Sequence, residues 1–243
     1  MGRINSIETM GALDGPGIRT IVFFQGCNLR CLYCHNPDMW KESGGYETSA
    51  EEVAKIVARY RPYYGDKGGV TFSGGEPLIQ PEFLLECLKA CKAKGVHTTL
   101  DTAGNGAGNY DEILAYTDLV ILDVKHEDPA SFQRITGCPI DGYLAFKEAV
   151  NLKNKAIWLK HVVVPGLTNQ PAHIKALKKE IFSFNNISKV ELLPYHTMGV
   201  TKYEKMGIPY KLAAHPEMNP EKLKELQDSL LRCEISENIE KSF

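Results

Sequence analysis

The sequence predicts an α/β fold in which parallel strands alternate with helices. Six short apolar, β-rich runs follow one another along the chain, and helical patterns lie between them. Strands separated by single helices pair in parallel through right-handed crossovers. Six such units are too few for a closed eight-unit barrel, so they suit an open partial barrel or a doubly wound sheet. No Pro/Ser-rich linker or internal repeat divides the 243 residues, which indicates a single domain over 1–243.

The predicted elements follow from these patterns in chain order. The strands are rich in Val, Ile, Leu and Phe, which favour extended backbone. They cover residues 20–24, 69–72, 96–100, 119–122, 157–164 and 189–193. The helices have apolar residues at helical spacing, and the last one follows a Pro-rich approach. They cover residues 49–60, 81–94, 110–116, 143–154, 171–184 and 220–233.

The composition excludes several classes of protein. Hydrophobic residues make up 43% and charged residues 24%, which is ordinary for a globular protein. No apolar run approaches the roughly 18 residues of a membrane span, and a net charge of −2 gives no electrostatic case for nucleic acid. Residues 1–5 lack the apolar stretch of a secretory signal, so we expect a cytoplasmic protein with reduced cysteines.

Three cysteines lie close together directly after the first predicted strand. Cys27, Cys31 and Cys34 have the spacing C-x3-C-x2-C, and no fourth cysteine follows nearby. A cubane iron–sulfur cluster needs one ligand for each of its four irons. Three thiolates leave one iron open to a non-protein ligand, where chemistry can take place. This spacing therefore indicates an enzyme, whereas an electron carrier would need a fourth protein ligand.

Other interpretations of the cysteines are weaker. Structural zinc favours paired C-x2-C knuckles or four Cys and His ligands, and His35 next to Cys34 would reach the same metal only with strain. A disulfide does not fit a chain without a secretory signal. Cys87 and Cys91 lie four residues apart among leucines, so we expect them in the core. The remaining thiols, Cys138 and Cys233, are scattered.

Polar motifs recur directly after the other predicted strands. They are Ser73-Gly74-Gly75-Glu76-Pro77, Asp101-Thr102-Ala103-Gly104, Asp123-Val124-Lys125, Pro165-Gly166-Leu167-Thr168-Asn169 and Pro194-Tyr195-His196. Each motif alone is weak, since an Asp at a strand end often caps the next helix. The carboxyl ends of parallel strands share one edge of the sheet, where ligand sites form. The repetition therefore predicts that these motifs meet the cysteines in one cleft.

The cysteine loop, residues 74–77 and the six βα units together resemble the radical S-adenosylmethionine (SAM) enzymes. More narrowly, the chain is similar to the pyruvate formate-lyase activating enzymes of that superfamily. The similarity runs from Arg3 to about Leu212. It is carried by Asp14-Gly15-Pro16-Gly17-Ile18-Arg19, Cys31-Leu32-Tyr33-Cys34-His35-Asn36-Pro37, Leu192-Leu193-Pro194-Tyr195-His196 and residues 201–207. The resemblance implies an open partial (β/α)6 barrel of the radical SAM type.

The resemblance also implies a reaction. Cys27, Cys31 and Cys34 would hold a 4Fe–4S cluster whose open iron is chelated by the amine and carboxylate of SAM. Reductive cleavage of SAM gives a 5′-deoxyadenosyl radical, which abstracts hydrogen from a glycine Cα of pyruvate formate-lyase. The cofactor supplies the chemistry, and the protein supplies orientation and exclusion of water. A flavodoxin or ferredoxin is the implied electron donor, and we expect a monomer.

Roles at the methionyl end of SAM are implied for five residues. Gly74 and Gly75 lack a Cβ, so their backbone can approach the methionyl amine closely. Glu76 would accept from that amine or orient its own loop. Lys125 offers a cation to the cofactor carboxylate, and Val124 precedes it at the same strand end.

The nucleoside end of SAM and a cation complete the implied site. Tyr33 and His35 flank the last cluster ligand and would border the adenine. His196 fits a ribose or adenine hydrogen bond, although a histidine of the core would explain it as well. Asp123 would bind a ribose hydroxyl or a cation. A monovalent cation is possible at Asp101, Thr102 and Asp123.

The absence of extra cysteines after the first motif narrows the choice of target enzyme. Several glycyl-radical activases carry a ferredoxin-like insert with extra cysteines after the first motif, but residues 38–48 contain none. This favours a compact pyruvate formate-lyase activase over those for diol, glycerol or aromatic substrates. A radical SAM enzyme that acts on another glycyl radical enzyme or on a small molecule stays an alternative, against which residues 14–19 and the tail after His196 argue.

Overall fold

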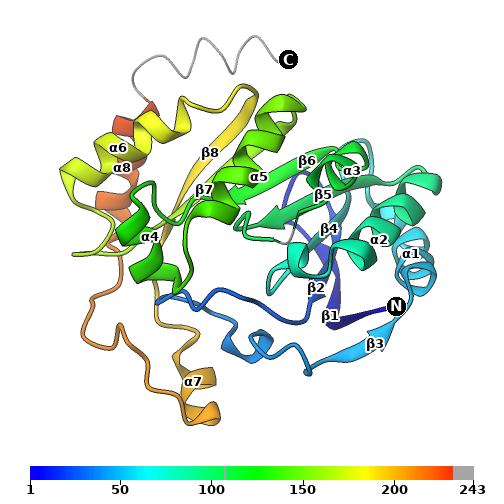
Figure 1. The fold of residues 1–243 in the computed structure, drawn as a ribbon, viewed down its shortest axis with the longest axis horizontal. Coiled ribbons are helices and arrows are strands. Elements are labelled where there is room, and N and C mark those ends of the chain that lie inside the picture. Colours follow the sequence, from blue (N-terminus) through cyan, green and yellow to red (C-terminus); the bar gives the residue numbers. More distant parts are fainter. Residues whose placement is uncertain (107, 232–243) are drawn as a thin grey trace.

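The fold is built on one open eight-stranded sheet (Figure 1). The computed structural model describes residues 1–106 and 108–231, and its strand order is β3-β1-β2-β4-β5-β6-β7-β8. Six neighbouring strands run parallel, and β1 is antiparallel to both β2 and β3. Within the described chain β3 and β8 do not pair with each other, so the barrel is incomplete. The strands are β1 (Gly2–Gly11), β2 (Arg19–Phe24), β3 (Tyr46–Thr48), β4 (Gly69–Gly74), β5 (His97–Thr102), β6 (Leu119–Asp123), β7 (Ala156–Val163) and β8 (Ile187–Pro194).

All six predicted strands are present as the parallel strands β2 and β4 to β8, and their bounds differ from the prediction by a few residues at most. The predicted α/β class is therefore confirmed. The two antiparallel strands were not predicted. β1 has one fully buried residue, Ile4, because it lies near the edge of the sheet and half of its positions carry polar side chains. β3 has only three residues.

Helices connect the parallel strands and lie outside the sheet. Figure 1 shows α1, α2 and α3 together beside β4 and β5, and α6 and α8 near β8. The helices are α1 (Ala50–Arg59), α2 (Pro81–Ala93), α3 (Tyr110–Ala115), α4 (Pro129–Thr136), α5 (Asp141–Leu152), α6 (Pro171–Ile181), α7 (Val200–Met206) and α8 (Pro220–Leu231). Cys87 and Cys91 of α2 are fully buried in the core, as expected, whereas Cys233 lies outside the described residues.

Two short helices, α4 and α7, were not predicted. Asp128 caps α4 by accepting a hydrogen bond from the backbone N–H of Ser131 at 2.8 Å, and Pro129 fits the first helical position. Gly137 ends α4 at φ 76°, in the left-handed region. The Asp-Pro pair was a readable start signal. α7 has seven residues, too few for a clear helical period.

Strand β7 separates two environments. Its residues alternate between half-buried and buried along the whole strand. Lys160 and Val162 point to the inner face of the sheet and line a cavity there. His161 points to the outer face, where it meets His173 of α6. Residues adjacent in sequence therefore belong to two different sites, as the period of a strand requires.

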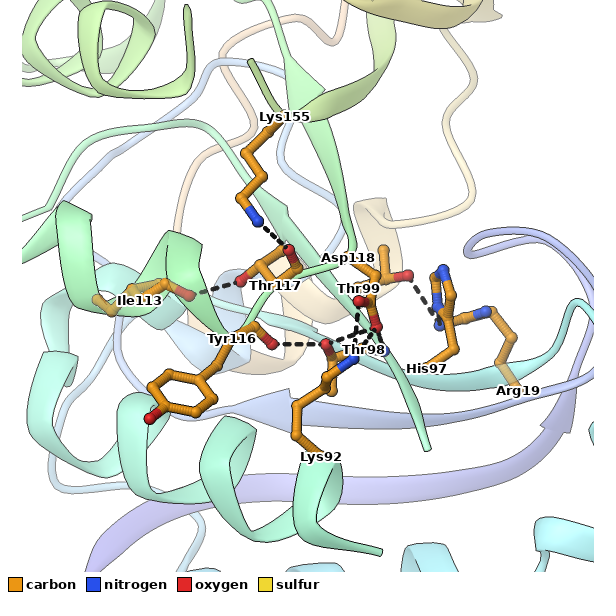
Figure 2. Close-up of polar contacts among 10 residues, drawn as sticks. All are labelled: Arg19, Lys92, His97, Thr98, Thr99, Ile113, Tyr116, Thr117, Asp118 and Lys155. Carbon is orange, nitrogen blue, oxygen red and sulfur yellow. Dashed lines mark hydrogen bonds and ion pairs between the residues drawn. The ribbon is translucent and has the colours of Figure 1, made fainter. Parts of the chain in front are cut away.

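The amino-terminal edge of the sheet is tied together by hydrogen bonds (Figure 2). Arg19 at the start of β2 is fully buried and donates to the hydroxyls of Thr71 and Thr99 and to the carbonyl of Val70, each at 2.7 Å. Figure 2 draws Arg19 and Thr99 of this set. Burial lowers the pKa of Arg19 to about 10, so the guanidinium stays charged at neutral pH. The motif that contains Arg19 therefore includes a structural residue at the edge opposite the cysteines.

None of the helices in the described part of the chain combines the length and the apolar character that crossing a membrane requires.

We expect Arg19→Met to lower the free energy of unfolding by about 2–4 kcal/mol, because the hydroxyls and the carbonyl that it binds lose their buried donor. Urea unfolding of the cluster-free protein, followed by circular dichroism, measures this change. Arg59→Met on the exposed side of α1 is the matched control and should change stability by about 0.5 kcal/mol or less. Equal urea midpoints for the two variants would contradict the structural role of Arg19.

Candidate active site

A cavity of about 400 Å³ lies at the carboxyl ends of the parallel strands. This size suits a small-molecule cofactor. The structure brings all but two of the predicted site residues to its wall. They are Cys27, Cys31, Tyr33, Cys34, His35, Gly74, Gly75, Asp101, Thr102, Asp123, Lys125 and His196. The two exceptions are Glu76 and Val124.

The three cysteines fit a multi-iron cluster better than a single ion. Burial raises the pKa of all three thiols, that of Cys31 to about 12, so bound iron is needed to favour the thiolates. Their sulfur atoms do not all lie within 4.8 Å of one another. One tetrahedral zinc would hold thiolates about 3.8 Å apart. Among the described cysteines no other lines the cavity.

The cysteine loop is held by both of the helices that were not predicted. At the end of α4, the carbonyls of Thr136 and Ile135 accept hydrogen bonds from the backbone N–H groups of Arg30 at 2.6 Å and Leu32 at 2.9 Å. From α7, the Tyr203 hydroxyl donates to the carbonyl of Cys34 at 3.0 Å. The loop therefore has a defined shape that does not depend on the cluster alone.

Gly74 and Gly75 allow the loop after β4 to lie against the loop after β2. A Cβ on Gly75 would lie 1.9 Å from the carbonyl oxygen of Gly26, and Gly74 has φ 115°. The backbone N–H of Gly75 donates to the carbonyl of Phe24 at 3.0 Å. Both glycines line the cavity, so bare backbone forms this part of its wall.

Glu76 and Val124 support the wall from behind. The carboxylate of Glu76 is fully buried and accepts hydrogen bonds from the Thr102 hydroxyl at 2.5 Å, Ala103 N–H at 2.9 Å and Leu78 N–H at 3.1 Å. Of the two roles expected for Glu76, these contacts support the orientation of its loop. Val124 is buried, and its N–H donates to the carbonyl of Lys160 at 2.9 Å.

Lys125 is a buried, charged ammonium in the cavity. Its Nζ pairs with Asp123 Oδ2 and lies 5.4 Å from the centre of the Tyr33 ring. Burial lowers the pKa of Lys125, but the charge and hydrogen bond of Asp123 together with the nearby Cys31 and Tyr33 outweigh it and raise the pKa well above its usual value. The cavity therefore offers a permanent cation at its wall.

Several cavity atoms have no hydrogen-bond partner among the residues described. They are the Tyr33 hydroxyl, Asp123 Oδ1 and His196 Nδ1. Unpartnered buried polar atoms cost free energy, so they mark places where a polar ligand binds. Together with Lys125 they fit a cofactor that carries an amino acid and a nucleoside.

His35 and His196 form one side of the cavity. Their rings stack with centroids 4.0 Å apart, and His35 Nε2 donates to the carbonyl of His196 at 3.1 Å. Burial lowers the pKa of His35, so its ring is neutral at neutral pH. His196 faces the cavity with a free Nδ1, which does not match a satisfied core histidine.

The expected cation site stays a prediction. Asp101, Thr102 and Asp123 all line the cavity. Burial raises the pKa of Asp101, whose Oδ2 accepts a hydrogen bond from the Ser73 hydroxyl at 3.0 Å. The Thr102 hydroxyl donates to Glu76 and accepts from the Gly104 N–H at 2.8 Å, so only its second lone pair or its carbonyl is available to a cation.

Two charged residues of the cavity were missed in the sequence. Lys160 lines it from β7, and Asp14 lines it from the segment between β1 and β2. The alternation of β7 could have placed Lys160 on the inner face. Asp14 belongs to the motif at residues 14–19, but it does not follow a predicted strand, so the strand-end pattern did not indicate it as a site residue.

Comparison with known proteins identifies the family. The Radical SAM superfamily model matches residues 21–177. A pyruvate formate-lyase-activating enzyme from Clostridium pasteurianum is 54% identical over 231 residues, which covers 95% of this chain and 97% of that protein. The chain belongs to the pyruvate formate-lyase-activating enzyme family of radical SAM enzymes. A relative of the same name from Listeria monocytogenes is 43% identical over 220 residues, 87% of this chain and 89% of that protein.

Solved structures agree with this family and with the fold. A domain of a pyruvate-formate lyase-activating enzyme from Bacteroides vulgatus has a TM-score of 0.54 at 25% identity, and covers 68% of this chain and 91% of that one. SuiB from Streptococcus suis, bound to S-adenosylmethionine, has a TM-score of 0.62 at 20% identity, and covers 88% and 49%. The second likeness concerns the fold only. The expected radical SAM fold and cofactors, a 4Fe–4S cluster and SAM, are thus confirmed by the family.

We expect Cys34→Ala to prevent assembly of a stable 4Fe–4S cluster, since two thiolates cannot hold it. Iron and sulfide analysis after anaerobic reconstitution measures the loss. Cys138→Ala is the matched control, because Cys138 Sγ donates to the Asn28 carbonyl at 3.2 Å beside the same loop but does not line the cavity. Four irons per chain in Cys34→Ala would remove this residue from the cluster.

Proposed function

We propose that this protein activates pyruvate formate-lyase by generating a glycyl radical on it. The observation that carries the proposal is the 54% identity to a pyruvate formate-lyase-activating enzyme along 95% of the chain. When bound, the cluster and SAM supply a 5′-deoxyadenosyl radical after one-electron reduction, and that radical takes a hydrogen atom from a glycine Cα. The protein must bind these groups, orient them and exclude water.

The cavity residues divide the task of binding. Cys27, Cys31 and Cys34 hold the cluster. The ammonium of Lys125 binds the methionyl carboxylate, because it is a charged, buried cation of the cavity wall that contacts Tyr33 of the cysteine loop. The backbone of Gly74 and Gly75 lies against the methionyl amine, where a side chain would intrude.

The nucleoside is bound by the two histidines and by polar atoms next to Lys125. The stacked rings of His35 and His196 offer a flat apolar surface and a free imidazole nitrogen. The Tyr33 hydroxyl and Asp123 Oδ1 provide two further polar atoms without partners among the described residues. These groups suit an adenine ring and ribose hydroxyls, which need stacking and directional hydrogen bonds together.

A peptide loop of the target needs a way into the cavity. In the described chain β3 and β8 do not close the barrel, and the cavity is lined on the β8 side by Leu193 and Pro194. An extended glycine loop enters on this open side. A flavodoxin or ferredoxin supplies the electron, and the protein acts as a monomer in the cytoplasm.

Lys125→Ala should weaken SAM binding to the cluster-loaded protein by about 10- to 150-fold, the equivalent of about 1.5–3 kcal/mol for a charged hydrogen bond. Isothermal titration under anaerobic conditions measures the affinity. Decarboxylated SAM should lose far less affinity in the same variant, because it lacks the group that Lys125 binds. Lys179→Ala, an exposed lysine on α6, is the control. Equal losses for both ligands would place Lys125 elsewhere than at the carboxylate.

The reduced protein with SAM should generate a stable radical on pyruvate formate-lyase. Electron paramagnetic resonance should show a doublet from the remaining α-hydrogen, which collapses to a singlet when that glycine is deuterated at Cα. A short peptide that copies the glycine loop should react more weakly, because most of the docking surface is missing. Cleavage of SAM without a radical on this partner would favour another glycyl radical enzyme or a small molecule as the substrate.

A further inference from the structure

A second cluster of metal-ligating side chains lies outside the cavity. His126 and Glu127 follow Lys125 directly, and His173 projects from α6. One ligand atom from each of the three lies within 4.8 Å of the other two. Their side chains are 9%, 17% and 5% exposed, respectively, and none of them lines the cavity. The cluster thus sits between the outer face of the sheet and α6.

The distances in this cluster match the edges of a metal coordination sphere. Glu127 Oε2 lies 3.2 Å from His173 Nδ1 and 3.5 Å from His126 Nδ1. A tetrahedral ion with bonds of about 2.0–2.1 Å holds its ligand atoms about 3.3–3.4 Å apart. The same Oε2 atom is buried and has no hydrogen-bond partner in the described chain.

Short contacts direct two imidazole rings at the Glu127 carboxylate. His161 Nδ1 lies 2.6 Å from the carbonyl oxygen of Val124 and must donate to it. With its proton on Nδ1, the His161 ring has an acceptor at Nε2. His173 Nε2, 3.2 Å away, therefore donates to it. His173 Nδ1 faces the Glu127 carboxylate, 3.3 Å from Oε1 and 3.2 Å from Oε2.

His126 also faces the carboxylate. Its Nδ1 lies 3.5 Å from Glu127 Oε2 and accepts a hydrogen bond from the backbone N–H of Asp128 at 3.0 Å. The His126 and His173 rings lie 4.2 Å apart with 32° between their planes. Glu127 Oε2 has no hydrogen-bond partner in the described chain, and a cation held by the three residues would supply one.

We propose that His126, Glu127 and His173 bind one divalent transition-metal ion of the zinc class. Two imidazoles and a carboxylate favour zinc and its neighbours over magnesium or calcium. Metal-bound histidines commonly donate their other ring N–H to a neighbour, and His173 already does so to His161. At His126 the ion replaces the hydrogen bond from Asp128. Three protein ligands leave one position for water.

The ion would fasten the segment that carries Lys125 to α6. Glu127 lies two residues beyond Lys125, and His161, which binds His173, also holds the Val124 carbonyl just before it. The site needs no cluster cysteine and no cavity residue. A negative result at this site would therefore not contradict the function proposed above, and a negative result for that function would not contradict this site.

Zinc binding to the cluster-loaded protein tests the proposal, because the cluster occupies the three cysteines. After incubation with zinc and desalting, elemental analysis should find one zinc per wild-type chain beside the cluster iron. Glu127→Gln, which keeps the shape of the side chain, and His173→Gln should each bind less than about a tenth as much, in line with the loss of one of three ligands. His215→Gln, which lies outside the site, should retain one zinc.

X-ray absorption at the zinc edge locates the bound ion. Only nitrogen or oxygen atoms at about 2.0–2.1 Å should surround it, without the sulfur at about 2.3 Å that a cysteine site would add. Amide exchange of residues 124–128 should slow with zinc in the wild type but not in Glu127→Gln.

Three results would overturn the proposal. The first is sulfur around the zinc. The second is full zinc binding by Glu127→Gln. The third is no zinc in the wild type, which would mean that a proton joins His173 to Glu127 instead. If His173→Gln fails to fold, as circular dichroism and iron content would reveal, Glu127→Gln alone decides.

Discussion

The site depends on a close backbone contact between the loops that follow β2 and β4. Pairing of the two strands runs from Arg19 to Phe24 and continues beyond their ends, because Gly75 N–H donates to the carbonyl of Phe24 and Glu76 N–H to that of Gly26. A Cβ at Gly75 would lie 1.9 Å from the Gly26 oxygen, so only glycine permits this contact. It puts Cys27, the first cluster ligand, beside the wall on which SAM must lie. The carboxylate of Glu76 then ties the same loop to the end of β5.

A second connection runs through the segment after β6. Asp123 and Lys125 face the cavity, Glu127 faces α6, and Asp128 caps α4. The far end of α4 holds the cysteine loop through backbone hydrogen bonds. Residues 123–128 and α4 therefore connect three features: Lys125 in the cavity, the group of His126, Glu127 and His173, and the loop that carries the cysteines. An ion at Glu127 would act on the cavity through this stretch without touching the cofactor.

The sequence was sufficient for features with a short, regular signal. The alternation of apolar runs and helices predicted all six parallel strands. The cysteine spacing and the strand-end motifs predicted much of the cavity wall, but none of residues 165–169 lines it, contrary to the expectation that this motif would join the others. Strand β1, next to the edge strand, was missed because its side chains are mostly polar and half-buried, and α7 because it has only seven residues. Whether Glu76 faces the cofactor or its own loop depends on local backbone geometry, which residue type alone does not reveal.

The group of histidines beside Glu127 could not be predicted from the sequence for a different reason. His126, His161 and His173 come from a loop, a strand and a helix, and no fixed spacing relates them. They meet because β7 turns His161 away from the cavity while its neighbours Lys160 and Val162 face it. Such a meeting follows from strand register and helix packing, which only the folded chain displays.

The two ends of the parallel strands have different roles: the amino-terminal end contributes stability, and the carboxyl end forms the binding site. At the amino-terminal edge, Arg19 satisfies hydroxyls and carbonyls of β4 and β5, so that edge needs no ligand. At the carboxyl edge, the Tyr33 hydroxyl, Asp123 Oδ1 and His196 Nδ1 are buried without partners in the described chain. Leaving such atoms unpaired costs about 1–3 kcal/mol each. A cofactor that supplies hydrogen-bond partners for these atoms recovers this free energy when it binds. Cofactor binding should therefore stabilise the folded protein at its carboxyl edge.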